Sequence, residues 1–339
     1  MSLVNRAGDA TQLVQQLQSE FVRGLEAVAS GVGEDRGFVR FDWLRDGGIH
    51  GGGNRYSTTG NSVFNRASVN VSHIHYDDMP NKALSSATAI STIIHPCNPH
   101  APSVHMHISW TEMRDGNGYW RLMADLNPAI FYPEDAEAFE KSLADTSPTN
   151  INQALEEGKK YFYIPTLDRH RGATHFYLEK YQSGDFEADL ALARDIGKQV
   201  IATYLRIFQQ ALENRATITE EDKHNQLDYH TLYFFQVLTL DRGTTSGLMV
   251  HDQNDQGIMG SLPSYVNKKI LLSWQSQMEH PQDELLAALI GSLPETGEVN
   301  DETRGQLAEV VRNHYGKHPE ALKLQASGSV IPPTLKNHS

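Results

Sequence analysis

The spacing of hydrophobic positions changes along the chain and predicts one helix followed by a series of strands. In residues 10–29, apolar side chains recur at intervals of three and four, which predicts an amphipathic helix ending near Gly31. Residues 62–74, 86–94, 103–110 and 119–126 have the composition and turn boundaries of strands, with DGNG at residues 115–118 as the clearest hairpin turn. Consecutive strands joined by short turns favour an antiparallel meander.

The rest of the chain adds helices around this sheet. Helical patterns cover residues 133–144, 151–159, 187–214, 283–293 and 301–315. Residues 173–178 are expected to add a strand, and residues 231–240 and 247–251 a hairpin that turns through DRGTTSG. The glycine-rich residues 47–60 are expected to form a loop that lets backbone approach a ligand, and the chain from residue 325 onward a loose end.

These elements predict an α+β fold, with a large, mostly antiparallel β-sheet flanked by α-helices on both sides in a single domain. Residues 1–294 are expected to form the main unit. Residues 295–339 are expected to be an additional helical and polar tail.

Composition narrows the class of protein. The 339 residues are 39% hydrophobic, enough for a sizeable core, and the formal net charge of -13 disfavours nucleic acid and anionic membranes as partners. No apolar run approaches the roughly 18 residues of a membrane span, and the N-terminal residues lack a secretory pattern, so a cytoplasmic location is expected. The single cysteine, Cys97, excludes an internal disulfide and is expected to be structural.

Candidate chemistry concentrates in residues 91–128. His95, His105 and His107 lie in or beside predicted strands, and Asp125 lies at the end of the last of them. Because side chains alternate along a strand, His105 and His107 point to the same face. An imidazole titrates near neutral pH, so these residues are candidates for proton transfer.

The order of short motifs resembles one known family. The pattern H-P-x-N-P-x-x-P-x-x-H is followed by D-L-x-P, and further pieces fall in the same order as in oxygen-dependent coproporphyrinogen III oxidases. These pieces are FDWLRDGG (41–48), GGGNR (51–55), SVNVSHI (68–74), YFYIP (161–165), RG (171–172), LDRGTTSGL (240–248) and MGSLP (259–263). The resemblance spans roughly residues 10 to 290.

The resemblance implies an activity and its partners. Enzymes of this family remove carbon dioxide from two propionates of a reduced tetrapyrrole and leave vinyl groups in haem biosynthesis. They use dioxygen, commonly use no organic cofactor, and form homodimers. The same set of properties is therefore expected here.

The resemblance also assigns residues. Asp125 matches an aspartate that faces the pyrrole nitrogens, and His105 matches a proposed general acid. His95 matches a histidine sometimes described as a metal ligand, and Ser91 matches a serine of the substrate site. His107 and Ser109 occupy motif positions, and Arg55 and Arg121 are cations expected near the site. The expected substrate-binding residues are therefore Ser91, His107, Ser109, Arg121 and Arg55.

The chain also departs from the family pattern. The family shows H-x-N-x-R where this chain has His105, His107 and Ser109, so the arginine that would hold a propionate is a serine. A serine offers no bidentate fork, which removes a charge-assisted pair worth about 1.5 to 3 kcal/mol. Arg121, or Arg40, Arg45 and Arg55, could compensate. The W-F-G-G-G segment appears here as YWRLM, which predicts a reshaped pocket.

Two alternatives follow from these departures. The gain of histidines permits a transition-metal site built from His95, His105, His107 and His175, with Asp125 as a further ligand, for a metal-dependent oxidase or hydrolase. The loss of the arginine also permits a carrier that binds a tetrapyrrole without turnover.

Overall fold

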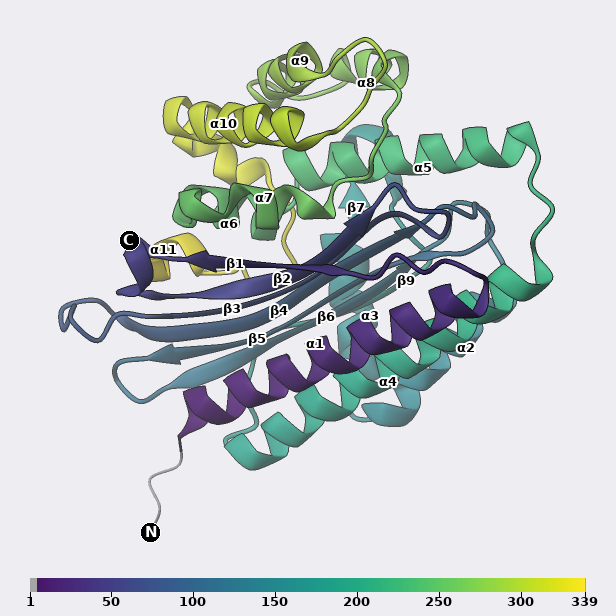
Figure 1. Ribbon diagram of the computed structural model, residues 1–339. Coiled ribbons are helices and arrows are strands. Elements are labelled where there is room, and N and C mark those ends of the chain that lie inside the picture. Colours follow the sequence, from purple (N-terminus) through teal and green to yellow (C-terminus); the bar gives the residue numbers. More distant parts are fainter. Residues whose placement is uncertain (1–4, 339) are drawn as a thin grey trace.

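The computed structural model describes residues 5–338, and these contain a seven-stranded antiparallel sheet in the order β1-β2-β3-β4-β5-β6-β9 (Figure 1). The strands are β1 (Val39–Leu44), β2 (Gly51–Thr59), β3 (Phe64–His75), β4 (Leu84–Pro96), β5 (Ser103–Met113), β6 (Gly118–Asn127) and β9 (Thr174–Tyr181). Six of the seven strands follow one another in sequence, as expected for a meander. The α+β fold with one large sheet is thereby confirmed.

Helices α1 (Arg6–Gly31), α2 (Pro133–Thr146) and α4 (Phe186–Asn214) cover one face of the sheet, and α3 (Ile151–Tyr161) packs against the edge strand β9. Alternate residues of the strands, such as Met106, Ile108 and Leu122, are buried against the apolar stripe of α1 and α4. Side-chain caps start both long helices, with Asn5 accepting from the Gly8 amide and Asp185 from the Ala188 amide. This face is a closed apolar core.

A second helical layer covers the opposite face. It contains α5 (Glu220–Thr239), α6 (Arg242–Val250), α7 (Asp255–Ile258), α8 (Lys268–Gln275), α9 (Gln282–Ser292) and α10 (Asp301–Lys317). These helices share a separate apolar cluster, and α10 packs against α6, α7 and α9. No helix within residues 5–338 is long and apolar enough to cross a membrane.

The prediction of a hairpin at residues 231–240 and 247–251 is wrong, because nearly all of these residues belong to α5 and α6. Every residue from Tyr229 to Thr239 is buried. A helix buried on all sides has no polar stripe, so its sequence loses the helical period and looks like a buried strand.

Two expectations about irregular segments are also wrong. The glycine-rich stretch is not a loop over its second half, because β2 begins at Gly51 and pairs with both β1 and β3. A Cβ atom at Gly53 would lie 2.0 Å from the Val71 carbonyl oxygen, so this glycine serves close strand packing. The chain after residue 325 is not a loose end either: a 3₁₀ turn (Pro319–Leu324) precedes it, and it ends in α11 (Thr334–His338).

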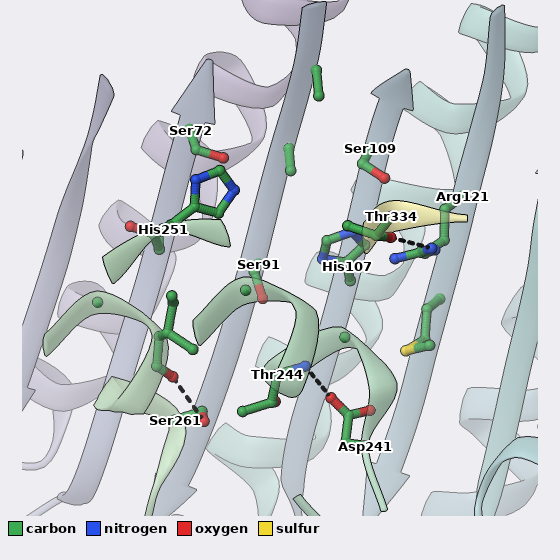
Figure 2. A pocket seen from close by; sticks show the side chains of 18 of the residues that line it. Ser72, Ser91, His107, Ser109, Arg121, Asp241, Thr244, His251, Ser261 and Thr334 are labelled. Carbon is green, nitrogen blue, oxygen red and sulfur yellow. Dashed lines mark hydrogen bonds between the residues drawn. The ribbon is translucent and has the colours of Figure 1, made fainter. Parts of the chain in front are cut away.

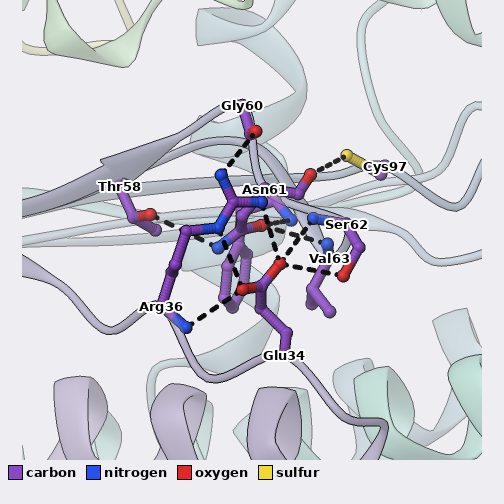
Figure 3. A network of polar contacts seen from close by, with 9 residues as sticks. Glu34, Arg36, Thr58, Gly60, Asn61, Ser62, Val63 and Cys97 are labelled. Carbon is purple, nitrogen blue, oxygen red and sulfur yellow. Dashed lines mark hydrogen bonds and ion pairs between the residues drawn. The ribbon is translucent and has the colours of Figure 1, made fainter.

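A polar network joins the connection after α1 to the turn between β2 and β3 (Figure 3). The Glu34 carboxylate accepts hydrogen bonds from Arg36 Nε at 3.1 Å and from the Ser62 amide at 2.7 Å. These bonds, with that of Arg36 first, lower the pKa of Glu34 to about 2. Cys97 borders this network, with Sγ donating to the Asn61 carbonyl at 3.4 Å, and burial raises the pKa of its thiol to about 11. This environment keeps Cys97 protonated, which agrees with a structural role.

Candidate active site

A cleft lies between the polar face of the sheet and the second helical layer (Figure 2). Strand alternation produces its floor: the residues of β3 to β6 that do not enter the first core are mostly small or polar. The floor consists of Ser68, Asn70, Ser72, Ala87, Ala89, Ser91, His105, His107, Ser109, Thr111, Tyr119, Arg121 and Met123. Residues of α5 to α7, including Tyr233, Asp241, Thr244 and His251, form the roof. The cavity volume is about 240 Å³.

Strand register sets which floor residues are neighbours. Ser91 is paired with His107, and Ser109 with Arg121. A third row across the sheet joins His105, Asp125 and His175. The sheet therefore brings together most of the residues that the sequence singled out, at adjacent positions on one face.

His105 and Asp125 form a hydrogen-bonded pair at one end of the floor. His105 Nδ1 lies 2.7 Å from Asp125 Oδ1. The His105 side chain is 19% exposed and lines the cleft, whereas the Asp125 side chain is 0% exposed and lies behind it. Because Nδ1 is engaged by the carboxylate, Nε2 is the ring nitrogen available to a ligand in the cleft.

Asp125 is held by two further partners. Its Oδ2 accepts from Asn127 Nδ2 at 2.6 Å and lies 3.1 Å from Arg171 Nη1. Burial alone would raise the pKa of Asp125, but Arg171 and His105 hold that pKa far below its usual value. Asp125 is thus a charged group whose two oxygens face the protein, a different placement from the ligand-facing aspartate expected from the sequence.

Arg171, which belongs to the RG motif, is the cationic partner of Asp125. Its guanidinium lies over the rings of Phe162 and Tyr233, each at 4.9 Å. It also donates to Asn127 Oδ1 at 2.5 Å. The proximity of Arg171 to Asp125 depends on the register of β6 against β9, which no local sequence pattern reveals.

Arg121 faces the cleft directly across the strand pair from Ser109, the position at which the resemblance noted above implies an arginine. Its guanidinium makes a bidentate pair with Glu179, at 2.5 Å from Nε and 3.2 Å from Nη2. Burial would lower the pKa of Arg121, but the Glu179 carboxylate raises it above its usual value. A cation therefore lies near the position of the missing one, but with its charge already balanced.

The charge of the cleft is unusual for a site that receives carboxylates. Among the described residues that line it, the only arginines or lysines are Arg121 and Arg171, and each has a buried carboxylate partner. The Asp241 carboxylate also lines the cleft and accepts from Tyr161 Oη at 2.7 Å and the Thr244 amide at 2.6 Å. Burial lowers the pKa of His107 well below its usual value, so this floor residue is neutral.

The four histidines suggested as metal ligands do not converge. His95 is fully buried, with Nδ1 2.9 Å from Ser103 Oγ and Nε2 3.1 Å from the Ser261 carbonyl. His175 Nε2 contacts the Arg171 carbonyl, and burial lowers the pKa of His175 to about 4. Within residues 5–338, no group of three or more His, Cys, Asp or Glu side chains has a geometry that could hold a metal ion. Only His105 and His107 of the set share the cleft.

Arg55 does not line the cleft. Its guanidinium lies 4.9 Å from the ring of Phe41, on the neighbouring edge strand. Sequence reasoning gave Asp241 only as part of the LDRGTTSGL motif, with no role in the site, although it lines the cleft. It also missed three cleft residues of the C-terminal segment, Thr334, Asn337 and His338. The polar composition of that segment gave no sign of its position.

Comparison with known proteins supports the resemblance noted above. The sequence profile of the family described as coproporphyrinogen III oxidase matches residues 9–292. A protein of Rickettsia bellii (strain OSU 85-389) named oxygen-dependent coproporphyrinogen-III oxidase is 30% identical over 273 residues, which are 76% of this chain and 94% of the relative. A protein of the same name from Rickettsia africae (strain ESF-5) is 30% identical over 245 residues, 68% of this chain and 84% of the relative. The chain therefore belongs to the coproporphyrinogen III oxidase family.

Proposed function

We propose that this protein catalyses the oxygen-dependent oxidative decarboxylation of propionate side chains of coproporphyrinogen III, or a closely related reduced tetrapyrrole, to vinyl groups. The observation that carries the proposal is the His105–Asp125 pair, at 2.7 Å, with His105 on the floor of the cleft and both residues inside the part of the chain that matches the family. An imidazole oriented by a buried carboxylate is suited to exchanging protons with a guest.

In the proposed reaction each residue has a defined task. His105 Nε2 exchanges the proton that leaves the side chain when a propionate loses carbon dioxide, and Asp125 keeps the proton of the neutral imidazole on Nδ1. Arg171 balances the charge of Asp125, so that the carboxylate stays ionised in a buried position. For each propionate, the bond to the carboxyl carbon breaks to release carbon dioxide, the carbon attached to the pyrrole loses a proton, and the two remaining side-chain carbons become joined by the vinyl double bond. Dioxygen accepts the two electrons released, takes up two protons and leaves as hydrogen peroxide, and the electron-rich pyrrole assists the loss of carbon dioxide.

The pyrrole N–H groups need an acceptor other than Asp125. Asn70 lines the cleft next to Ser91 in the strand register, and its Oδ1 is buried without a hydrogen-bond partner among the described residues. A buried acceptor without a donor is costly, and a guest N–H would satisfy it. We assign Asn70 as the acceptor for the macrocycle, with the Ser91 hydroxyl as its neighbour.

Assembly and location belong to the same proposal. We infer a homodimer, supported by family membership and by the edge strand β1, where Val39, Phe41 and Leu44 are 47–61% exposed. We also infer a cytoplasmic enzyme, supported by the single free thiol and by the biosynthetic role implied for the relatives by their name.

The test is turnover by the purified full chain. With coproporphyrinogen III in air, the wild type is expected to consume dioxygen and give a divinyl product, detected as a fluorescent porphyrin after oxidation. His105→Gln should reduce kcat at least about 100-fold, while His170→Gln, an exposed histidine outside the cleft, should not. A folded wild type that binds the porphyrinogen tightly without consuming dioxygen would instead indicate a carrier, and full turnover by His105→Gln would contradict the assignment.

A further inference from the structure

The segment that follows the second helical layer returns to the cleft. Residues 326–338, here called the C-terminal strap, lie beyond the part of the chain that matches the family. The strap begins at Ala326, whose amide donates to the Leu240 carbonyl at 2.9 Å, and Ser329 Oγ contacts the Glu157 carboxylate at 2.6 Å. It ends in α11, which packs against α6 above the sheet (Figure 1).

Three residues of α11 enter the cleft and contact its polar groups. Thr334 Oγ1 accepts from Arg121 Nη2 at 3.3 Å, as Figure 2 shows. Asn337 Nδ2 donates to Tyr119 Oη at 2.8 Å. His338 Nδ1 lies 2.9 Å from Tyr76 Oη, and the His338 carbonyl accepts from Lys82 Nζ at 2.6 Å.

The attachment of α11 differs from that of the residue that precedes the strap. None of the α11 side chains is buried, whereas Gln325, just before the strap, is 5% exposed and hydrogen-bonded to Thr245 and Tyr315. Thr334 and Asn337 contact the cleft through single hydrogen bonds, which water or polar groups of a ligand could replace. His338 adds ring contacts, with its centroid 5.9 Å from that of Tyr76 and 5.4 Å from that of His251. A short polar helix on a firmly anchored stem can leave its site without disturbing the core.

The space that α11 leaves is too small for the proposed substrate. With α11 in place the cavity measures about 240 Å³, below the roughly 300 to 1,000 Å³ of pockets for drug-sized ligands. A macrocycle of four pyrrole rings with its side chains needs more. The Thr334 hydroxyl also occupies the Arg121 Nη2 donor, the group on the floor best suited to a propionate.

We propose that α11 is a displaceable occupant of the cleft, which competes with the tetrapyrrole for Arg121 and Tyr119 and must leave before it binds. This inference rests on the proposed function for the identity of the competitor. The strap then restricts entry to guests whose own carboxylates and macrocycle outcompete the Thr334 and Asn337 contacts.

The experiment compares the full chain with a chain ended after Pro333, using coproporphyrin III, the oxidised macrocycle that is not turned over. Porphyrin fluorescence measures binding, and a labelled peptide of residues 330–339 measures the affinity of the strap for its site. The shortened chain is expected to bind porphyrin at least tenfold more tightly, with kcat/KM for the porphyrinogen raised by a similar factor and kcat unchanged. The peptide should bind the shortened chain and be displaced by porphyrin.

Two full-length variants test whether the effect of the shortening comes from loss of the α11 contacts or only from the shorter chain. Combined Thr334→Ala, Asn337→Ala and His338→Ala should tighten porphyrin binding in the same direction as the shortening. Ile331→Ser, at a strap residue that is 63% exposed, should not change it. Equal porphyrin affinity in the full and shortened chains would overturn the proposal, as would weaker binding by a folded shortened chain.

The peptide distinguishes failure of the strap from failure of the proposed function. If neither chain binds or converts the tetrapyrrole, the proposed function fails, and binding of the peptide to the shortened chain but not to the full chain would still support α11 as an occupant. A peptide that binds neither chain would overturn the occupant as well.

Discussion

Asp125→Asn is expected to lower both the stability of the protein and its turnover, for two separable reasons. The substitution removes a carboxylate that is 0% exposed and leaves Arg171, whose side chain is 3% exposed, as an unpaired buried cation. Removing one partner of such a pair costs about 3 to 5 kcal/mol. An asparagine that retains shape and donates toward His105 would also force the imidazole proton from Nδ1 to Nε2, which should lower kcat by about 10² to 10⁴.

Arg171→Gln separates the two effects when combined with Asp125→Asn. The double variant contains no buried charge at this position, so its free energy of unfolding should return to within about 1 to 2 kcal/mol of the wild type. Its kcat should stay low, because His105 still lacks the carboxylate that orients it. Urea denaturation followed by circular dichroism measures the stability, and porphyrin fluorescence measures turnover. Wild-type stability or turnover within threefold of wild type in Asp125→Asn would refute the reasoning.

Three further predictions concern the charge of the cleft, the stability of the protein at acid pH and the reactivity of the Cys97 thiol. Ser109→Arg, which returns a cation to the floor, should lower KM for the tetracarboxylate porphyrinogen about tenfold, since a charge-assisted hydrogen bond is worth about 1.5 to 3 kcal/mol; Ser109→Gln is the control, and an equal gain there would contradict an effect of charge. The pKa of Glu34 is lowered to about 2 in the folded protein, so its stabilising contribution is complete above the unfolded pKa of about 4.3 and is lost as pH falls toward 2. Glu34→Gln should therefore make the free energy of unfolding, measured by urea titration, less dependent on pH between about 4.3 and 2. The same pH dependence in Glu34→Gln and the wild type would argue against a stabilising role of the Glu34 network. Because the pKa of Cys97 is raised to about 11, iodoacetamide at pH 8 should label the native thiol far more slowly than the unfolded one, and Cys97→Ser should keep kcat within twofold; rapid native labelling would count against a buried thiol.

The elements that the sequence predicted correctly are those with one buried face. The strands β4, β5 and β6 and the helices α1 and α4 each present an apolar side to the first core, and their periods match their structure. Prediction failed for α5 because residues 229–239 are buried on every side. It failed for β2 because the role of Gly53 is set by its neighbours β1 and β3, which are not encoded in the local pattern.

The candidate site also contains features that the sequence predicted and features that it could not. Alternation within β5 predicted that His105 and His107 share a face, and the motif pointed to Asp125 beside them. The direction of the Asp125 carboxylate depends on Arg171, and the pairing of Arg121 with Glu179 depends on β9, so neither could be obtained from spacing. The approach of α11 to Arg121 joins residues 213 positions apart in the sequence, and only the packed structure brings them together.

A structure of the full chain with coproporphyrin III bound tests the central claim most directly. The account predicts the macrocycle over the floor of the cleft, with a pyrrole nitrogen near Asn70, a propionate near His105 and α11 displaced. A second surface cavity lies outside this cleft and is lined by Phe131, His170 and Trp274. A macrocycle seated there, or anywhere out of reach of His105, would contradict the account.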